Sequence, residues 1–207
     1  MADVAAGSDI QPLQQHPAVY YHVPSSSQAP LYRLVRLRAL SESPARFGSS
    51  FARELAFPLE TWQTRLANPD AVLFVATSRD ILRDEDALGS DDWTQPAQFE
   101  ASDRLHYGMI CCIRSFEDPT DARIVSFWVA PSARRKGVGK ALIQMTLSWA
   151  SSRNKEGAGF ENVLLDVKGD NVAARNLYEV CGFKSLSTSN PAIMTQLDTL
   201  RYVYRLY

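Results

Sequence analysis

A short basic and glycine-rich segment past the middle of the chain has the composition of an anion-binding site. Residues 134–141 read Arg-Arg-Lys-Gly-Val-Gly-Lys-Ala and lead directly into a stretch with helical spacing. The first N–H groups of a helix lack intrahelical partners and sit at the positive end of its dipole, so they attract anions. Gly137 and Gly139 have no Cβ atom, which lets a phosphate approach the backbone. The segment therefore predicts a phosphate site.

Two common phosphate-binding motifs do not fit these letters. A Walker A loop, Gly-x-x-x-x-Gly-Lys-Ser/Thr, would end at Gly139-Lys140, but residue 134 is Arg and residue 141 is Ala. A dinucleotide fingerprint would use Gly137 and Gly139 and then needs a small residue where Leu142 stands. Neither ATP nor a nicotinamide cofactor is indicated.

The segment resembles motif A of the GCN5-related N-acetyltransferase (GNAT) superfamily, Arg/Gln-x-x-Gly-x-Gly/Ala. Arg134, Gly137 and Gly139 occupy its three defining positions, and the preceding residues 127–131 are similar to the family's fourth strand and its bulge. The resemblance implies that backbone N–H groups of the turn wrap the pyrophosphate of acetyl-CoA. The contacts it implies in the turn are Arg134, Arg135, Lys136, Gly137, Val138, Gly139, Lys140 and Ala141.

A second segment, residues 171–183, resembles motif B of the same family, Asn-x-x-Ala-x-x-Leu-Tyr-x-x-x-Gly-Phe. Six positions agree, namely Asn171, Ala174, Leu177, Tyr178, Gly182 and Phe183. The resemblance implies that Asn171 and Ala174 lie beside the pantetheine arm, although Asn171 also suits a helix N-cap. It places the Tyr178 hydroxyl near the CoA sulfur. A phenol with a pKa of about 10 stays protonated at neutral pH and can protonate the departing thiolate; a core tyrosine is the alternative.

The resemblance also implies a fold. It is an α/β (α+β) GNAT fold, with a mixed, mostly antiparallel sheet of six to seven strands, helices on both faces and a splay between strands four and five. The main chain of Phe127, Trp128 and Val129 would meet the pantetheine in that splay. A backbone N–H near Val129 would stabilise the oxyanion.

The general base is left open by the sequence. Many family members carry a Glu on strand four, but residues 123–129 contain no acid, and Ser126 stands where a carboxylate would be expected. A chain of water molecules, or an acceptor that arrives neutral, needs no dedicated base. The side chains considered for the role are Glu117, Asp121, Asp166 and His106.

The three cysteines are predicted to be reduced thiols that bind no metal. Cys111 and Cys112 are adjacent, the third is Cys181, and no Cys-x-x-Cys pair occurs. Adjacent strand residues point to opposite faces, so at most one of Cys111 and Cys112 could face a cleft. We interpret both as small buried hydrophobes rather than as an acetyl-cysteine nucleophile.

Hydrophobic periodicity predicts the elements that position these motifs. The expected strands are residues 31–37, 71–76, 105–116, 123–129, 163–167, 183–186 and 200–206. The expected helices are residues 47–57, 59–66, 138–153 and 171–180. Residues 1–30 are predicted to be a flexible tail with a short extended segment at 19–23, and residues 31–207 the acetyltransferase domain. Residues 79–104 are predicted to form an acidic loop insertion.

Composition limits the class of protein. The 207 residues are 45% hydrophobic and 22% charged, with net charge −1, which excludes a disordered chain and gives no overall attraction to nucleic acid or membrane. We expect a cytoplasmic or nucleocytoplasmic protein that is a monomer or a homodimer. The expected function is transfer of the acetyl group of acetyl-CoA to an amine of a small molecule, protein or peptide. The alternative is a noncatalytic acyl-CoA-binding sensor. Trp62, Trp128 and Tyr107 are considered as lining of an acceptor cleft, or as core.

Overall fold

A single seven-stranded sheet organises the protein. The computed structural model describes residues 19–78, 106–155, 159–186 and 199–206. The strand order is β1-β2-β3-β4-β5-β7-β6, and every neighbouring pair is antiparallel except β4 and β5. The strands are β1 (Val19–His22), β2 (Ala71–Ser78), β3 (His106–Arg114), β4 (Asp121–Val129), β5 (Asn162–Lys168), β6 (Lys184–Ser185) and β7 (Thr199–Arg205).

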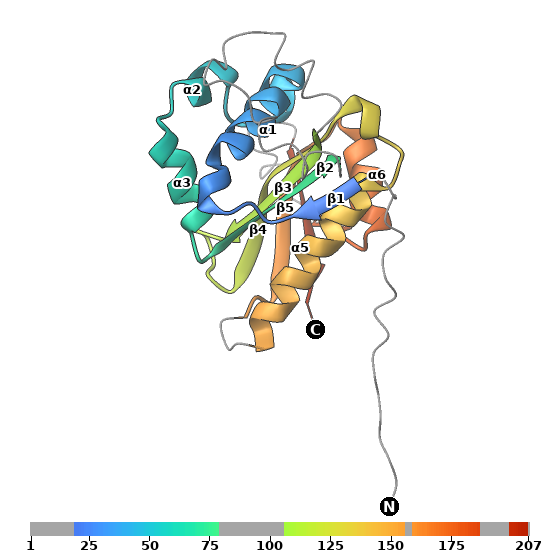
Figure 1. Ribbon diagram of the computed structural model, residues 1–207. Coiled ribbons are helices and arrows are strands. Elements are labelled where there is room, and N and C mark those ends of the chain that lie inside the picture. Colours follow the sequence, from blue (N-terminus) through green and yellow to red (C-terminus); the bar gives the residue numbers. More distant parts are fainter. Residues whose placement is uncertain (1–18, 79–105, 156–158, 187–198, 207) are drawn as a thin grey trace, which may run out of the picture.

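Helices cover both faces of this sheet (Figure 1). The N-terminal group comprises α1 (Ala29–Glu42), α2 (Phe51–Leu55) and α3 (Leu59–Ala67), and the later pair comprises α5 (Val138–Lys155) and α6 (Val172–Val180). Short 3-10 turns precede α1 (Ser26–Gln28), follow it (Pro44–Arg46) and follow β4 (Pro131–Ala133). The predicted mixed sheet with helices on both faces is confirmed. None of the described helices is long and apolar enough to cross a membrane.

The register of β3 and β4 shows which residues face which helices. Trp128 lies opposite Met109, and its indole contacts α1, whereas Phe127 lies opposite Ile110 and approaches the first turn of α5. We call these two sides of the sheet the α1 face and the α5 face. β2 is buried over nearly its whole length because both of its faces are covered.

The prediction of a strand at residues 31–37 is wrong, because this segment is part of α1. Almost every side chain from Leu31 to Leu40 is buried, including Arg36 and Arg38. The segment therefore has no exposed polar face, and its hydrophobic pattern does not distinguish a strand, with a period of 2, from a helix, with a period of 3.6. Pro30 in the first turn and the many Leu, Ala and Arg residues favour the helix.

The first strand lies earlier than expected. β1 pairs with β2 in antiparallel register from Val19 opposite Ser78 to His22 opposite Val75, and Val19 is buried. The structured part of the chain thus begins before the predicted boundary at residue 31. The expected flexible tail at residues 1–18 and the acidic loop at 79–104 lie outside the described residues.

The remaining predicted elements occur with small shifts. The expected helix at 47–57 is a 3-10 turn followed by the short α2, whose N-cap Ser50 accepts the Arg53 N–H. Gly182 ends the α6 segment with φ 93°, the left-handed conformation predicted for it.

β4 and β5 separate halfway along β4. They pair only from Asp121 opposite Asn162 to Ile124 opposite Leu165. Directly after this point Cys111 faces Ser126 while Cys112 faces Ile124, so Val125 is an extra residue in β4, a β-bulge. A bulge bends its strand, which accounts for the separation. The predicted splay is confirmed.

Candidate active site

The turn from β4 into α5 has the backbone geometry of an anion site. Arg135 and Gly137 both have positive φ values, 61° and 84°, before α5 begins at Val138. Left-handed residues in such a turn direct successive N–H groups into one concavity. The first hydrogen bond of the helix runs from Ala141 N–H to Gly137 C=O, so the N–H groups between them have no intrahelical partner. Arg135 holds a conformation that costs a non-glycine residue about 1 kcal/mol, as is common at binding sites.

The two motif A glycines have different reasons for being glycine. A Cβ atom on Gly137 would meet no atom within 4 Å, so its left-handed φ is what requires glycine. A Cβ atom on Gly139 would lie 3.0 Å from Leu177 Cδ2 and 3.3 Å from Phe127 Cζ. Gly139 therefore allows α5 to pack closely against β4 and α6.

Beyond the bulge, β4 presents an open backbone edge to the splay. The Ala130 N–H donates to the Tyr107 carbonyl at 2.9 Å, so the backbone groups of Ala130 and Trp128 face β3. By alternation, those of Phe127 and Val129 face the splay, beyond the last residue pair between β4 and β5. The Val129 carbonyl accepts a hydrogen bond from Arg134 Nε at 3.0 Å. The Val129 N–H and both groups of Phe127 remain along that edge for a ligand.

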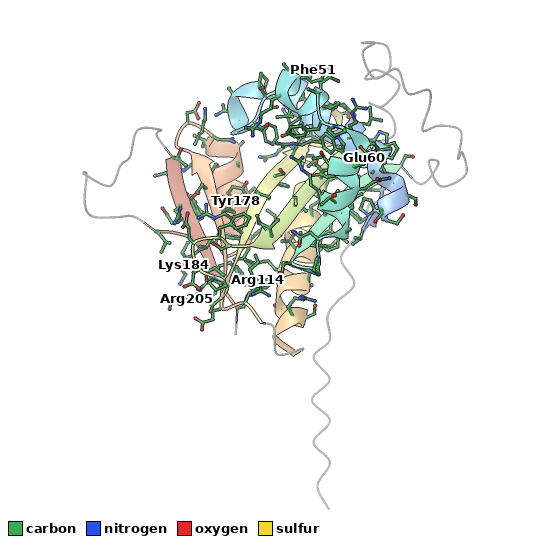
Figure 2. All side chains as sticks on the ribbon, turned by 90° about the vertical axis from the view of Figure 1, so that its left-hand side faces the viewer. Phe51, Glu60, Arg114, Tyr178, Lys184 and Arg205 are labelled. Atoms are coloured by element: carbon green, nitrogen blue, oxygen red, sulfur yellow. The ribbon has the colours of Figure 1, made fainter. Side chains whose placement is uncertain are left out.

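Tyr178 lies on the α5 face of the splay, where α6 meets the sheet (Figure 2). Its ring is 6% exposed and packs against Phe127, Phe183 and Tyr202, with centroids 5.9–6.2 Å apart. Burial raises the pKa of the Tyr178 hydroxyl, so it stays protonated at neutral pH. No described residue hydrogen-bonds to this hydroxyl, whereas the neighbouring Tyr202 hydroxyl donates to Glu179 at 2.8 Å.

Asn171 caps α6, one of the two roles considered for it. Its side-chain oxygen accepts the Ala174 N–H at 3.4 Å, and its own N–H donates to the Lys168 carbonyl. This cap fixes the start of α6 at the C-terminal end of β5, which also places Ala174 there. Contact of either residue with pantetheine stays a prediction.

The α1 face of the splay carries charged side chains. We call Glu117, Arg123, Asp166 and Arg201 the charged cluster. Arg123 pairs with both carboxylates, and Arg201 pairs with Asp166 at 2.9 Å and with Glu117 at 2.8 Å. Asp166 follows Leu165, the last β5 residue paired with β4. The cluster therefore lies at the point where the two strands begin to part.

Of the four side chains considered as general base, the structure brings only Glu117 and Asp166 together. Asp121 accepts from Asn162 at the opposite end of the β4–β5 ladder, at 2.8 Å. His106 is 1% exposed at the start of β3, next to the outer strands. Ser126 is buried behind the bulge on β4.

The aromatic residues considered for an acceptor cleft are mostly core. Trp62 is fully buried and packs edge-on against Tyr32, and Trp128 is 4% exposed under the guanidinium of Arg38. Only Tyr107 is half-buried. The three cysteines are free, and burial raises the pKa of Cys111 to about 11, which disfavours a thiolate nucleophile.

Two groups at the splay were not predicted from the sequence. Glu42, the last residue of α1, accepts from Trp128 Nε1 at 3.1 Å and from an Arg134 terminal nitrogen at 2.7 Å. Arg46 pairs with Asp170, which joins the α1–α2 connection to the loop before α6. Both contacts link positions more than 80 residues apart, and no local sequence pattern signals them.

Within the described ranges, no group of three or more His, Cys, Asp or Glu side chains could hold a metal ion.

Comparison with known proteins agrees with this geometry. Residues 93–183 match the family model of the Acetyltransferase (GNAT) family. No curated protein matches the chain. Among solved structures, an acetyltransferase of GNAT family from Staphylococcus aureus Mu50 is similar, with 15% identity, a TM-score of 0.60 and coverage of 92% of this chain and 100% of the other.

Two further solved structures cover a similar share of the chain. The acetyltransferase of GNAT family from Streptococcus pneumoniae has 13% identity, a TM-score of 0.61 and coverage of 91% of this chain and 99% of the other. The ribosomal-protein-S18-alanine N-acetyltransferase from Escherichia coli has 14% identity, a TM-score of 0.53 and coverage of 91% and 94%. At such identities the likeness concerns the fold. Residues 93–183 are therefore a domain of the GNAT acetyltransferase family, within a chain that has the GNAT fold.

Proposed function

We propose that the protein is an acetyl-CoA-dependent N-acetyltransferase that transfers the acetyl group directly to an amine. One observation carries the proposal, the position of Phe127. Its ring lies against Gly139 of motif A and against Tyr178 of motif B, and its backbone lies on the open edge of β4. A phosphate-binding turn, a strand edge for an amide-rich arm and a protonated phenol thus meet at the splay.

The turn would hold the pyrophosphate through main-chain N–H groups. Arg135, Lys136 and Lys140 add positive charge around it, and the dipole of the 18-residue α5 points its positive end there. Arg134 contributes less directly, because its side chain is occupied by the Val129 carbonyl and Glu42. The Phe127 backbone would pair with the amides of the pantetheine arm, as one strand edge pairs with another.

The chemistry follows from what lies on each face. The amine attacks the thioester carbonyl carbon, the C–S bond breaks, and the products are an amide and the CoA thiol. The Val129 N–H on the open edge would stabilise the negative charge that develops on the carbonyl oxygen. Tyr178 would give its proton to the departing sulfur. Burial raises the pKa of the Tyr178 hydroxyl, so it would keep its proton until the thiolate forms.

The acceptor would reach the thioester from the α1 face, opposite Tyr178. The charged cluster lies on this side, and its members are 17–59% exposed. Both carboxylates of the charged cluster are held in ion pairs. The attacking amine would therefore lose its proton to water at this exposed face. Glu117 and Asp166 would attract a protonated amine rather than deprotonate it.

The test is calorimetric titration of the full chain with acetyl-CoA, followed by release of CoA thiol in the presence of a panel of amines and peptides. We expect micromolar binding and thiol release that depends on the amine, and the best amine names the acceptor class. Binding with no release on any acceptor would favour the acyl-CoA sensor. A chain that does not bind acetyl-CoA would contradict both functions.

A further inference from the structure

We infer that Glu42 is a positioning residue for the acetyl-CoA turn, acting through Arg134. The inference rests on the proposed function and adds a residue that lies outside both motifs, about 90 positions before the turn in sequence. It depends on successive contacts from Glu42, in the last turn of α1, through Arg134 to Val129 at the open edge of β4.

The two oxygens of Glu42 bind different parts of the site. Oε2 accepts from the indole Nε1 of Trp128 at 3.1 Å, and Oε1 accepts from Arg134 at 2.7 Å. A carboxylate that accepts from two donors at fixed positions is itself fixed, and a charge-assisted bond is among the stronger hydrogen bonds. The side chains of Arg134 and Glu42 are 50% and 27% exposed, so water screens the ion pair in part, and the second bond to the buried Trp128 helps to fix the carboxylate.

Trp128 makes this anchor rigid. Its ring is buried, and the guanidinium of Arg38 lies 5.0 Å from the ring centroid. Arg38 in turn donates to the His106 carbonyl at the start of β3 at 3.0 Å. These contacts tie the end of α1 to β3 and β4. Glu42 therefore keeps a fixed position relative to the two strands.

Arg134 transmits this position to the site. Its terminal nitrogen is held by Glu42, and its Nε donates to the Val129 carbonyl at 3.0 Å. The planar guanidinium fixes both bonds at once, so the direction of one sets the direction of the other. The exit of β4 and the first residue of the phosphate-binding turn are held together by one side chain.

The first consequence is a change in the affinity for acetyl-CoA. Without Glu42, Arg134 has a half-exposed side chain with one remaining partner, and the turn that starts at Arg134 loses its link to α1. The turn must then be ordered when the cofactor binds, which weakens binding. In the part of the chain that the structure describes, no hydrogen bond or ring contact joins Tyr178 to Glu42 or Arg134, whereas the Val129 carbonyl accepts from Arg134. The Kd for acetyl-CoA, and not turnover, is therefore the quantity that tests the inference.

The experiment is a double-mutant cycle on the full chain, with the Kd for acetyl-CoA measured by calorimetry. We expect Glu42→Ala to weaken binding about tenfold, the size of a coupling of about 1.4 kcal/mol. Glu42→Gln, which keeps an oxygen acceptor, should recover about half of that loss on a logarithmic scale. Arg134→Ala should weaken binding similarly, and the double variant should bind no more weakly than Arg134→Ala.

Glu60→Ala is the matched control. Glu60 is exposed at the first turn of α3, on the same side of the sheet (Figure 2), and its loss should leave the Kd within twofold. If Glu42→Ala lowers the melting temperature strongly, Glu42→Gln in the same cycle decides the outcome.

Three results would overturn the inference. Glu42 variants that bind acetyl-CoA as tightly as the unaltered chain would show that the contact does not position the turn. Losses that add in the double variant would show that Glu42 does not act through Arg134. Failure of the unaltered chain to bind acetyl-CoA would overturn the proposed function, and this inference with it.

Discussion

The two faces of the sheet at the splay are lined by different kinds of chemical group. The α5 face consists of backbone in special conformations and of packed rings, at Arg135, Gly137, Gly139 and the Tyr178 group. The α1 face consists of charged side chains held by partners from distant parts of the chain. Under the proposed function, the cofactor would meet the α5 face and the acceptor the α1 face, so we expect substitutions on the α1 face to change the acceptor preference.

The α1 face contains both a buried and an exposed ion pair, and we expect the two to contribute differently to stability. Arg36 and Glu54 are buried together, with side chains 7% and 3% exposed, and Arg65 adds a bond to the same carboxylate. Arg46 and Asp170 are 38% and 71% exposed. Four substitutions, in order of decreasing effect, test the differences between the two faces and between these two ion pairs.

Glu54→Ala should cause the largest change. It leaves the buried Arg36 guanidinium without its partner, which typically costs about 3–5 kcal/mol in the free energy of unfolding. Chemical denaturation of the variant measures the loss, with Glu60→Ala as a control that removes an exposed carboxylate from the neighbouring helix. A loss below about 1 kcal/mol would mean that the pair is no more important than a surface pair.

The pH dependence of stability sharpens the same prediction. Burial alone would raise the pKa of Glu54, but the hydrogen bonds and charge of Arg36, with help from Ser49 and Arg65, hold it below its ordinary value. The stabilisation is therefore complete above the unfolded pKa of about 4.3 and is lost as the pH falls through the lower folded value. The unaltered chain should lose stability in acid more steeply than Glu54→Gln.

Gly137→Asp should abolish tight binding of acetyl-CoA. The substitution forces a side chain into a left-handed conformation and places a negative charge where phosphates are expected. We expect a loss of affinity of at least about 100-fold, or about 2.7 kcal/mol. The control is Gly48→Asp, because Gly48 is also open on all sides but has no positive φ. Unchanged calorimetric affinity would contradict the phosphate site.

Tyr178→Phe should lower turnover without changing the affinity for acetyl-CoA. Loss of a general acid costs about 100-fold in rate, whereas the ring continues to pack against Phe127 and Phe183. Tyr202→Phe is the matched control, since its hydroxyl already binds Glu179 and Arg175. Equal losses in both variants would assign Tyr178 to packing.

The raised pKa of Tyr178 adds a pH profile to this test. Because burial shifts the pKa above its ordinary value of about 10, the phenol stays protonated throughout the range in which the amine loses its proton. Turnover at saturating substrates should rise with pH as the amine deprotonates and show no fall up to about pH 10. A fall below pH 9 would contradict the assignment of Tyr178 as the acid.

Arg46→Ala should have the smallest effect. An exposed pair contributes about 0–1 kcal/mol, so the melting temperature should change by no more than about 2–4 °C. Arg53→Ala, which removes another exposed arginine nearby, is the control. A large drop in melting temperature would mean that the link between the α1–α2 connection and the α6 loop supports the fold.

Sequence motifs located the residues that line the α5 face, whose contacts with acetyl-CoA stay a prediction, and missed Glu42 and Arg46 on the α1 face. Gly137, Gly139 and Tyr178 belong to contiguous motifs, since a turn, a helix start and a helix cap are local structures. Glu42 and Asp170 act through partners 92 and 124 positions away, which no local pattern records.

The errors have a similar origin. A strand is wrongly predicted at residues 31–37 because the buried arginines of this helix imitate the polar positions of a strand. The same residues are buried only because Glu54 and Trp128 lie against them in the folded protein. The bulge at Val125 is visible only in the register of β4 with β3, and the type of this residue does not signal it.

β1 has a practical consequence for how this protein can be shortened. Its four residues cover the outer edge of β2, a strand that is almost wholly buried and rich in Val, Leu and Phe. A chain trimmed to begin at Leu31 would leave that edge with free N–H and C=O groups, which is a template for another copy to add its own strand. Such a protein would be prone to associate edge to edge, whereas one trimmed to begin just before Val19 would keep the four-residue β1 as a short outer strand over β2.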